Sequence, residues 1–118
     1  MKIAIPIDDS KQAVCVTFGR APYFMLHDTE TGVTELKENP AAQAQGGAGP
    51  KAAQFVADSG AEVLLTVRCR ENAAQVLKAA EIQIYKTEGS SAEENLKAFL
   101  GNKLAELTHF HAGFHGHP

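Results

Sequence analysis

The sequence predicts an α/β fold with a mixed five- to six-stranded sheet and about three helices. Two observations lead to this prediction. Strands alternate with helices over the second half of the chain, and residues 62–67 (EVLLTV) form an almost continuously apolar run. Alternation implies right-handed crossovers between parallel strands, and a continuous apolar run is typical of a strand covered on both faces. A hairpin in the first third adds an antiparallel pair, so we expect a mixed sheet.

The first third of the chain is predicted to form a meander of short strands. Runs rich in β-branched or aromatic residues occur at residues 2–7, 13–18 and 23–28, and turn-forming residues follow the first two. Residues 29–32 (TETG) have the polar, glycine-ended character of a hairpin turn. Residues 33–37 then alternate apolar and polar, as an edge strand or a half-buried strand does.

The second part is predicted to alternate helices and strands. Residues 40–49 (PAAQAQGGAG) hold no large apolar side chain and lead to Pro50, which is favoured at the first helical position. Apolar residues then fall on one helical face until Gly60, which ends the helix. The remaining predicted elements are a strand, a helix, a strand and a helix, over residues 62–67, 72–80, 82–85 and from Ser90 or Ser91 onward. The predicted order is ββββαβαβα.

Composition and charge exclude several functions. The chain has 118 residues, enough for one domain, with 11 basic and 14 acidic residues. A net charge of −3 without a basic stripe argues against nucleic-acid binding. No apolar run is long enough to cross a bilayer, and the N-terminus lacks the apolar segment of a secretory signal. We therefore expect a cytoplasmic protein without nucleic-acid or membrane partners.

Histidine is concentrated at the C-terminus. Four of the five histidines lie in the last ten residues, His109, His111, His115 and His117. Imidazole is a common ligand for zinc, nickel and copper. We therefore divide the chain into a domain over residues 1–108 and a histidine-rich flexible tail over residues 109–118, with a divalent metal ion as its candidate ligand. The other interpretation is a tail that binds metals only opportunistically.

Two loops that follow predicted strands carry the best candidate binding residues. The first holds Thr17, Phe18, Gly19 and Arg20, and the second holds Cys69, Arg70 and Asn72. In open α/β sheets, ligands bind in the crevice at the carboxyl ends of the strands. We expect the neighbouring arginines and a following helix N-terminus to favour the thiolate of Cys69. The alternative is an inert, half-buried thiol.

Three glycines and a second cysteine add weaker candidates. Gly46, Gly47 and Gly49 precede a predicted helix, where backbone N–H groups can bind an anion. A flexible linker is the simpler explanation of these glycines. Cys15 lies two residues before Thr17, so both would point to one face of a strand. Cys15 then either shares a soft metal with Cys69 or acts as a small apolar residue.

The sequence contains no recognisable catalytic set, so we predict that the protein is not an enzyme. Asp8 and Asp9 are adjacent on the chain and would point to opposite sides of a strand. An enzyme that uses Cys69 as its nucleophile would need a base that the sequence does not reveal. His27 is interpreted as a surface or packing residue.

The order of these motifs resembles a known family. The opening MKIAIP, the segment FGRAPYF at residues 18–24, a glycine-rich stretch before a helix and a C-terminus rich in histidine and glycine are similar to the dinitrogenase iron–molybdenum cofactor biosynthesis family. That family comprises NifX- and NafY-like small proteins and includes the orange protein of sulfate reducers. The resemblance covers about residues 1–100. It implies a three-layer, ribonuclease-H-like fold.

The resemblance also implies a function: binding, carrying or storing a metal–sulfur cluster without catalysis. The expected cargo is an iron–sulfur, molybdenum–iron–sulfur or molybdenum–copper–sulfur species, and the expected partners are cluster-assembly proteins, with the chain a monomer or weak homodimer. The family commonly has histidine where this chain has Thr17, and Gly-Pro where it has Arg70-Glu71. We therefore hypothesise that Cys15 and Cys69 replace or supplement that histidine. The alternative function is a divalent-metal buffer or chaperone that works through the histidine tail.

Overall fold

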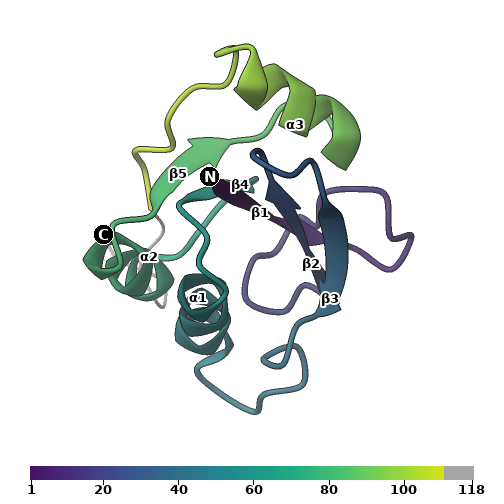
Figure 1. The fold of residues 1–118 in the computed structure, drawn as a ribbon. Helices are drawn as coiled ribbons and strands as arrows, with labels where there is room; N and C mark the ends of the chain where they lie inside the picture. Colours follow the sequence, from purple (N-terminus) through teal and green to yellow (C-terminus); the bar gives the residue numbers. More distant parts are fainter. Residues whose placement is uncertain (111–118) are drawn as a thin grey trace.

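The computed structural model describes residues 1–110, which form a mixed sheet with helices on both faces (Figure 1). The strands are β1 (Lys2–Ile7), β2 (Tyr23–Asp28), β3 (Thr34–Glu38), β4 (Val63–Thr66) and β5 (Gln83–Lys86), and the helices are α1 (Ala48–Asp58), α2 (Glu71–Ala79) and α3 (Ala92–Leu100). The strand order is β3-β2-β1-β4-β5. β1 pairs antiparallel with β2 and parallel with β4, which confirms the predicted mixed sheet.

The three layers follow from the side-chain alternation of the central strand. On β1, Ile3 and Ile5 belong to the cluster that includes Ala92 of α3, whereas Ala4 belongs to the cluster that includes Val56 of α1. Helices α1 and α2 therefore cover one face and α3 covers the other, as Figure 1 shows. A strand buried on both faces needs apolar residues at every position, and KIAIPI supplies them from its second residue on.

The helix boundaries agree with the sequence except at the start of α1. This helix begins at Ala48, so Pro50 stands in the first turn rather than at the first position. Proline is tolerated there because the first-turn N–H groups have no partner within the helix. Gly47 caps α1 with a φ of 67°, a left-handed conformation that favours glycine. At α3 the predicted cap is confirmed, because the Ser91 hydroxyl accepts the Glu94 N–H at 3.1 Å.

The predicted strand over residues 13–18 is wrong. Only two isolated bridges form there, Ile7 with Val14 and Ala13 with Ser91. The backbone of this segment divides its hydrogen bonds between two neighbours: Cys15 N–H donates to the Pro6 carbonyl and Val14 N–H to the Ser90 carbonyl, both at 2.8 Å. Because these N–H groups bond to two different segments, the residues cannot form a continuous row of hydrogen bonds with one neighbouring strand. The sheet therefore has five strands.

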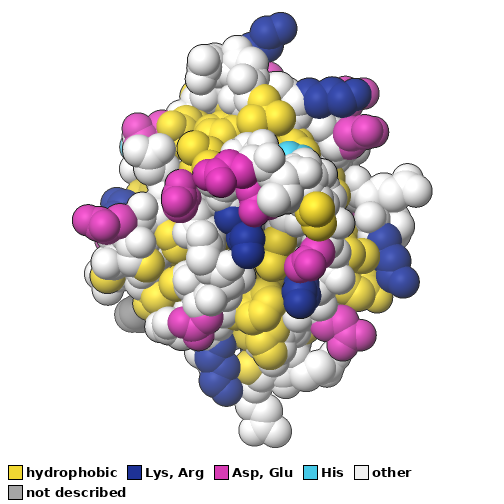
Figure 2. Space-filling model, in the orientation of Figure 1, with side chains coloured by type: hydrophobic (Ala, Val, Ile, Leu, Met, Phe, Trp, Pro, Cys, Tyr) yellow, Lys and Arg dark blue, Asp and Glu magenta, His cyan; other side chains and the backbone are white. Residues whose placement is uncertain are grey.

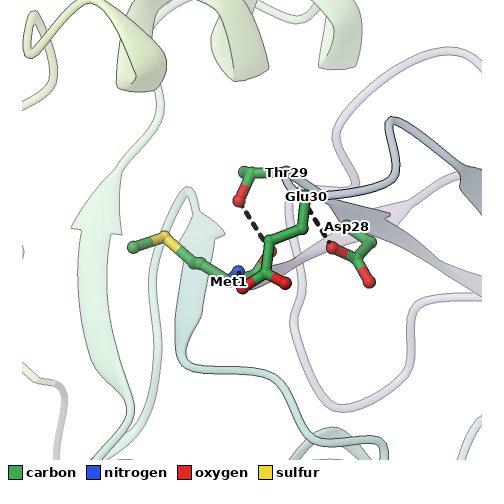
Figure 3. Close-up of polar contacts among 4 residues, drawn as sticks. All are labelled: Met1, Asp28, Thr29 and Glu30. Atoms are coloured by element: carbon green, nitrogen blue, oxygen red, sulfur yellow. Dashed lines mark hydrogen bonds and ion pairs between the residues drawn. The ribbon is translucent and has the colours of Figure 1, made fainter.

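The N-terminus is fixed by the turn between β2 and β3, as Figure 3 shows. Thr29 donates to the Met1 carbonyl through its N–H at 2.8 Å and its hydroxyl at 3.1 Å. The Met1 ammonium lies 3.5 Å from a Glu30 carboxylate oxygen, and Glu30 N–H donates to Asp28 at 2.8 Å. This backbone bond, with smaller contributions from Thr31 N–H and nearby positive charge, lowers the pKa of Asp28.

The chain after α3 returns to the sheet. Lys86 N–H donates to the Ala105 carbonyl and Leu107 N–H to the Ile84 carbonyl, both at 2.9 Å, so this segment pairs with β5. Phe110, inside the predicted tail, packs against the core on the α1–α2 side. His109 is exposed, and His111, His115 and His117 lie outside the described residues.

The surface in Figure 2 carries acidic and basic side chains interspersed, with neither sign dominating that face. Among the helices described in residues 1–110, none is both long and apolar enough to cross a membrane.

Candidate functional site

Two loops and two helix N-termini surround one open cavity of about 240 Å³. We call it the strand-end cavity, because its loops follow β1 and β4. Four segments of the chain line it. The first loop contributes Thr17, Phe18, Gly19 and Arg20, and the second loop contributes Arg68, Cys69 and Arg70. Helix α1 contributes Gly49 and helix α2 contributes Ala73. Residues predicted separately from the two loops and from the glycine-rich stretch thus meet at one place.

A close contact between glycines holds one wall of the cavity. A Cβ atom built on Gly19 would stand 2.8 Å from the Gly49 nitrogen and 2.9 Å from its Cα. A Cβ on Gly49 would stand 3.3 Å from the Cβ of Ala73. The first loop, the start of α1 and the start of α2 therefore pack directly against one another, and only glycine fits at position 19.

Three arginines give the cavity its positive charge. The side chains of Arg20, Arg68 and Arg70 are all exposed and line its walls. The Arg20 guanidinium donates through Nη1 to the Ala44 carbonyl at 2.6 Å, with a longer contact of 3.4 Å to the Ala42 carbonyl. Within the described residues, none that lines the cavity carries a carboxylate. An anion would therefore meet arginine donors from two loops.

The two helix N-termini add to this positive potential. The N-cap residues are Gly47 in α1 and Arg70 in α2. Among the described residues, neither accepts a hydrogen bond from a first-turn N–H through its side chain. In α2, the Asn72 side chain accepts the Ala73 N–H at 2.8 Å. First-turn N–H groups carry the positive end of the helix dipole, which favours an anion at this position.

Cys69 contradicts the thiolate prediction. Its side chain is buried at 1% exposure, and desolvation raises the pKa of the thiol to about 12, against a smaller lowering by the positive charge of Lys78. Its Sγ lies 3.6 Å from the Arg70 carbonyl. Arg68 and Arg70 are exposed, so solvent screens their charges, whereas the Cys69 side chain is buried. Without a ligand, Cys69 is a thiol at neutral pH.

The other predicted residues lie near the cavity without lining it. Cys15 is half-buried, and its Sγ contacts the Thr17 hydroxyl at 3.5 Å. Gly46 and Gly47 are exposed just before α1, and Asn72 lies in the first turn of α2. The cavity thus brings Cys69 together with the first loop, with Cys15 one side chain further out.

Two residues that line the cavity, Arg68 and Ala73, are not among the candidates predicted from the sequence. Arg68 is one of the two arginines beside Cys69, and Ala73 is an ordinary helix residue. The pattern Arg-Cys-Arg was the available signal for Arg68. Within residues 1–110, no group of three or more His, Cys, Asp and Glu side chains is arranged to hold a metal ion. His27 lies on β2 and pairs with the Thr34 hydroxyl at 2.8 Å.

Comparison with known proteins gives consistent matches. The family model described as "dinitrogenase iron-molybdenum cofactor" matches residues 1–102. An uncharacterized protein of Methanocaldococcus jannaschii is 34% identical over 110 residues, which cover 91% of this chain and 92% of that protein. The apo form of the orange protein from Desulfovibrio gigas superposes with a TM-score of 0.83 at 33% identity, covering 90% of this chain and 92% of the other. A Thermotoga protein of the DUF35 family superposes with a TM-score of 0.78 at 40% identity, covering 92% and 95%.

Proposed function

Because the chain belongs to the dinitrogenase iron-molybdenum cofactor family, we propose that it binds and carries an anionic metal–sulfur cluster in the strand-end cavity, without catalysing a reaction. The observation on which this proposal rests is that three arginines and two helix N-termini meet around a cavity that no carboxylate within residues 1–110 lines. The cluster is cargo that brings its own sulfide ligands. The protein then needs to supply charge and few metal ligands.

The size of the cavity supports a small inorganic cargo. Its volume of about 240 Å³ falls below the roughly 300–1,000 Å³ that is typical of sites for drug-sized organic ligands. The walls mix guanidinium groups with the apolar surfaces of Phe18 and Ala73. A thiometallate is anionic and polarisable, so it suits both kinds of wall.

The thiols are the proposed soft ligands. Cys69 lines the cavity, and Cys15 does not line it but contacts Thr17, which does. The family resemblance places a histidine at the position of Thr17. Metal binding displaces the thiol proton, so a raised pKa weakens coordination at a given pH but does not prevent it. If Cys15 and Cys69 are ligands, the Cys15→Ser/Cys69→Ser double variant loses most cluster uptake. Unchanged uptake would remove both thiols from the proposal.

Purification of the untagged protein without oxygen tests the function. Visible charge-transfer bands together with sulfide and iron, molybdenum or copper in simple ratios support a cluster carrier and give the cargo's composition. A sample isolated empty is then reconstituted with iron and sulfide, or with tetrathiomolybdate and copper. Failure of both reconstitutions under conditions where the protein is folded would contradict the proposal.

The histidine cluster favours a second function, a buffer or chaperone for nickel, zinc or copper. The two functions separate when the tail histidines His109, His111, His115 and His117 are replaced together by glutamine. A cluster carrier keeps its cluster binding in this variant. A metal buffer loses its divalent metal and has no cluster to keep.

We further propose that the fold is of the ribonuclease-H-like type, with the domain over residues 1–108 and the tail over residues 109–118. The chain acts in the cytoplasm, where its two cysteines stay reduced. It receives or delivers its cargo by contact with cluster-assembly proteins, and it works as a monomer or weak homodimer.

A further inference from the structure

One buried side chain ties together the segments that hold Arg20. The Asn39 amide nitrogen donates to the Gly19 carbonyl at 3.0 Å and to the Ala21 carbonyl at 2.8 Å. These two carbonyls belong to the residues on either side of Arg20. Asn39 is 5% exposed; its bond to the Ala21 carbonyl is buried and its bond to the Gly19 carbonyl is partly buried, so water competes little with them. The backbone around Arg20 is therefore fixed from both sides by one amide group.

Asn39 also organises the turn that holds the Arg20 side chain. Its Oδ1 accepts the Ala41 N–H at 2.9 Å, and its own carbonyl accepts the Ala42 N–H at 3.2 Å. The Arg20 guanidinium donates to the carbonyls of Ala42 and Ala44 in this same turn. One residue thus sets both the backbone and the side-chain anchor of a cavity-lining cation.

We propose that Asn39 is a positioning residue for cargo binding: it sets the direction of Arg20 and the shape of the first loop without touching the cargo. The inference rests on the proposed function of the strand-end cavity. Both N–H donors of the Asn39 amide and its oxygen are used within the fold. Losing these bonds leaves the Gly19 and Ala21 carbonyls and the Ala41 N–H without this partner, and the loop must rearrange to satisfy them.

The chain offers a matched control at Asn95. Its side chain is 1% exposed and makes the same pattern of bonds, donating to the Ser91 and Gly89 carbonyls and accepting the Glu88 N–H at 2.7 Å. Asn95 lies in α3, and neither it nor its three partners lines the cavity. Replacing either asparagine by leucine removes equivalent bonds without adding charge. The Asn→Ser pair repeats the comparison with a milder change if a leucine variant does not fold.

The test compares Asn39→Leu with Asn95→Leu at a temperature where both are folded. Equilibrium dialysis of tetrathiomolybdate is expected to give about tenfold weaker binding for Asn39→Leu. The hydrogen bond between the Arg20 guanidinium and the anion is lost when the guanidinium is displaced. Asn95→Leu is expected to bind as the wild type does. In an Arg20→Gln background, Asn39→Leu should weaken binding much less, because the group that it positions is absent. Equal binding by the two leucine variants, or full additivity with Arg20→Gln, overturns the inference.

A second readout separates this inference from the proposed function. Within the first loop, the Ala21 N–H donates to the Phe18 carbonyl at 3.4 Å. Its hydrogen exchange is expected to be faster in Asn39→Leu than in Asn95→Leu. If the wild type does not bind tetrathiomolybdate, the proposed function fails for that probe, and the exchange result still decides whether Asn39 holds the loop. Equal exchange in the two variants overturns the inference.

Discussion

Gly19 and Gly49 touch backbone to backbone, and no side chain fits between them. A Cβ on Gly19 would lie 2.8 Å from the Gly49 nitrogen, in a contact that only movement of the backbone can relieve. This contact joins the loop that carries Arg20 to the first turn of α1. The glycines therefore bring the loop of Arg20 and the N-terminus of α1 into one wall of the strand-end cavity.

Gly19→Ala is expected to destabilise the protein by about 1–3 kcal/mol, because overpacking against rigid backbone forces the loop away from α1. Gly46→Ala is the control, since a Cβ there meets nothing within 4 Å, and it should be neutral or up to about 1 kcal/mol stabilising. Thermal unfolding measures both changes. A Gly19→Ala variant as stable as the wild type would show that the loop and helix are not in close contact.

Arg68→Gln is expected to weaken tetrathiomolybdate binding by about tenfold, since it removes a charged donor from the cavity. Binding by the wild type should also fall as salt is raised, because exposed arginines are screened. Lys97→Gln is the matched control, an exposed cation on α3 away from the cavity. If Lys97→Gln weakens binding as much as Arg68→Gln, net charge rather than the cavity governs affinity.

Cys69 is expected to resist alkylation by iodoacetamide in the folded, unliganded protein. With a pKa of about 12, only about one thiol in ten thousand is ionised at pH 8, and burial limits access further. Cys15 is half-buried and should react first. Mass spectrometry after brief labelling locates the modified residue, and labelling in guanidinium shows that both can react. Preferential labelling of Cys69 in the native protein would contradict its burial.

Acid is expected to weaken the turn between β2 and β3. The pKa of Asp28 is lowered in the fold, so its ionised form contributes stability above the unfolded pKa near 4 and loses it as pH falls through the lower folded value. Asp28→Asn should therefore be less stable than the wild type at pH 7, with the difference shrinking as pH falls to about 2–3. Thermal melts at both pH values measure this. A difference that stays constant with pH would assign no role to the Asp28 charge.

Much of the fold follows from local patterns. The run EVLLTV became β4 because its buried positions need apolar residues on both faces, and Ser91 caps α3 as its position before two glutamates indicates. The strand predicted over residues 13–18 failed because its partners, Pro6 and Ser90, belong to different parts of the chain. Apolar alternation predicts an extended segment but cannot tell which neighbours divide its hydrogen bonds.

The site was partly predictable, because loops that follow adjacent parallel strands meet at one sheet edge. In the structure the loops that hold Arg20 and Cys69 follow β1 and β4 and line one cavity. The sequence points to Arg20 through the strand predicted over residues 13–18, and that strand does not form. The ionisation of Cys69 did not follow, because desolvation outweighs flanking arginines and burial depends on the whole core. Asn39 was missed because its partners Gly19 and Ala21 are 20 and 18 residues away.

The central claim is that the strand-end cavity holds an anionic metal–sulfur cargo. The most direct measurement is reconstitution of the protein with copper and tetrathiomolybdate, followed by gel filtration and analysis of retained metal and sulfide. We predict retention of coloured cluster by the wild type and by the variant with its four tail histidines replaced by glutamine, with strong loss in an Arg20→Gln/Arg68→Gln variant that still folds. Retention that survives loss of both arginines but disappears with the tail histidines would contradict the account.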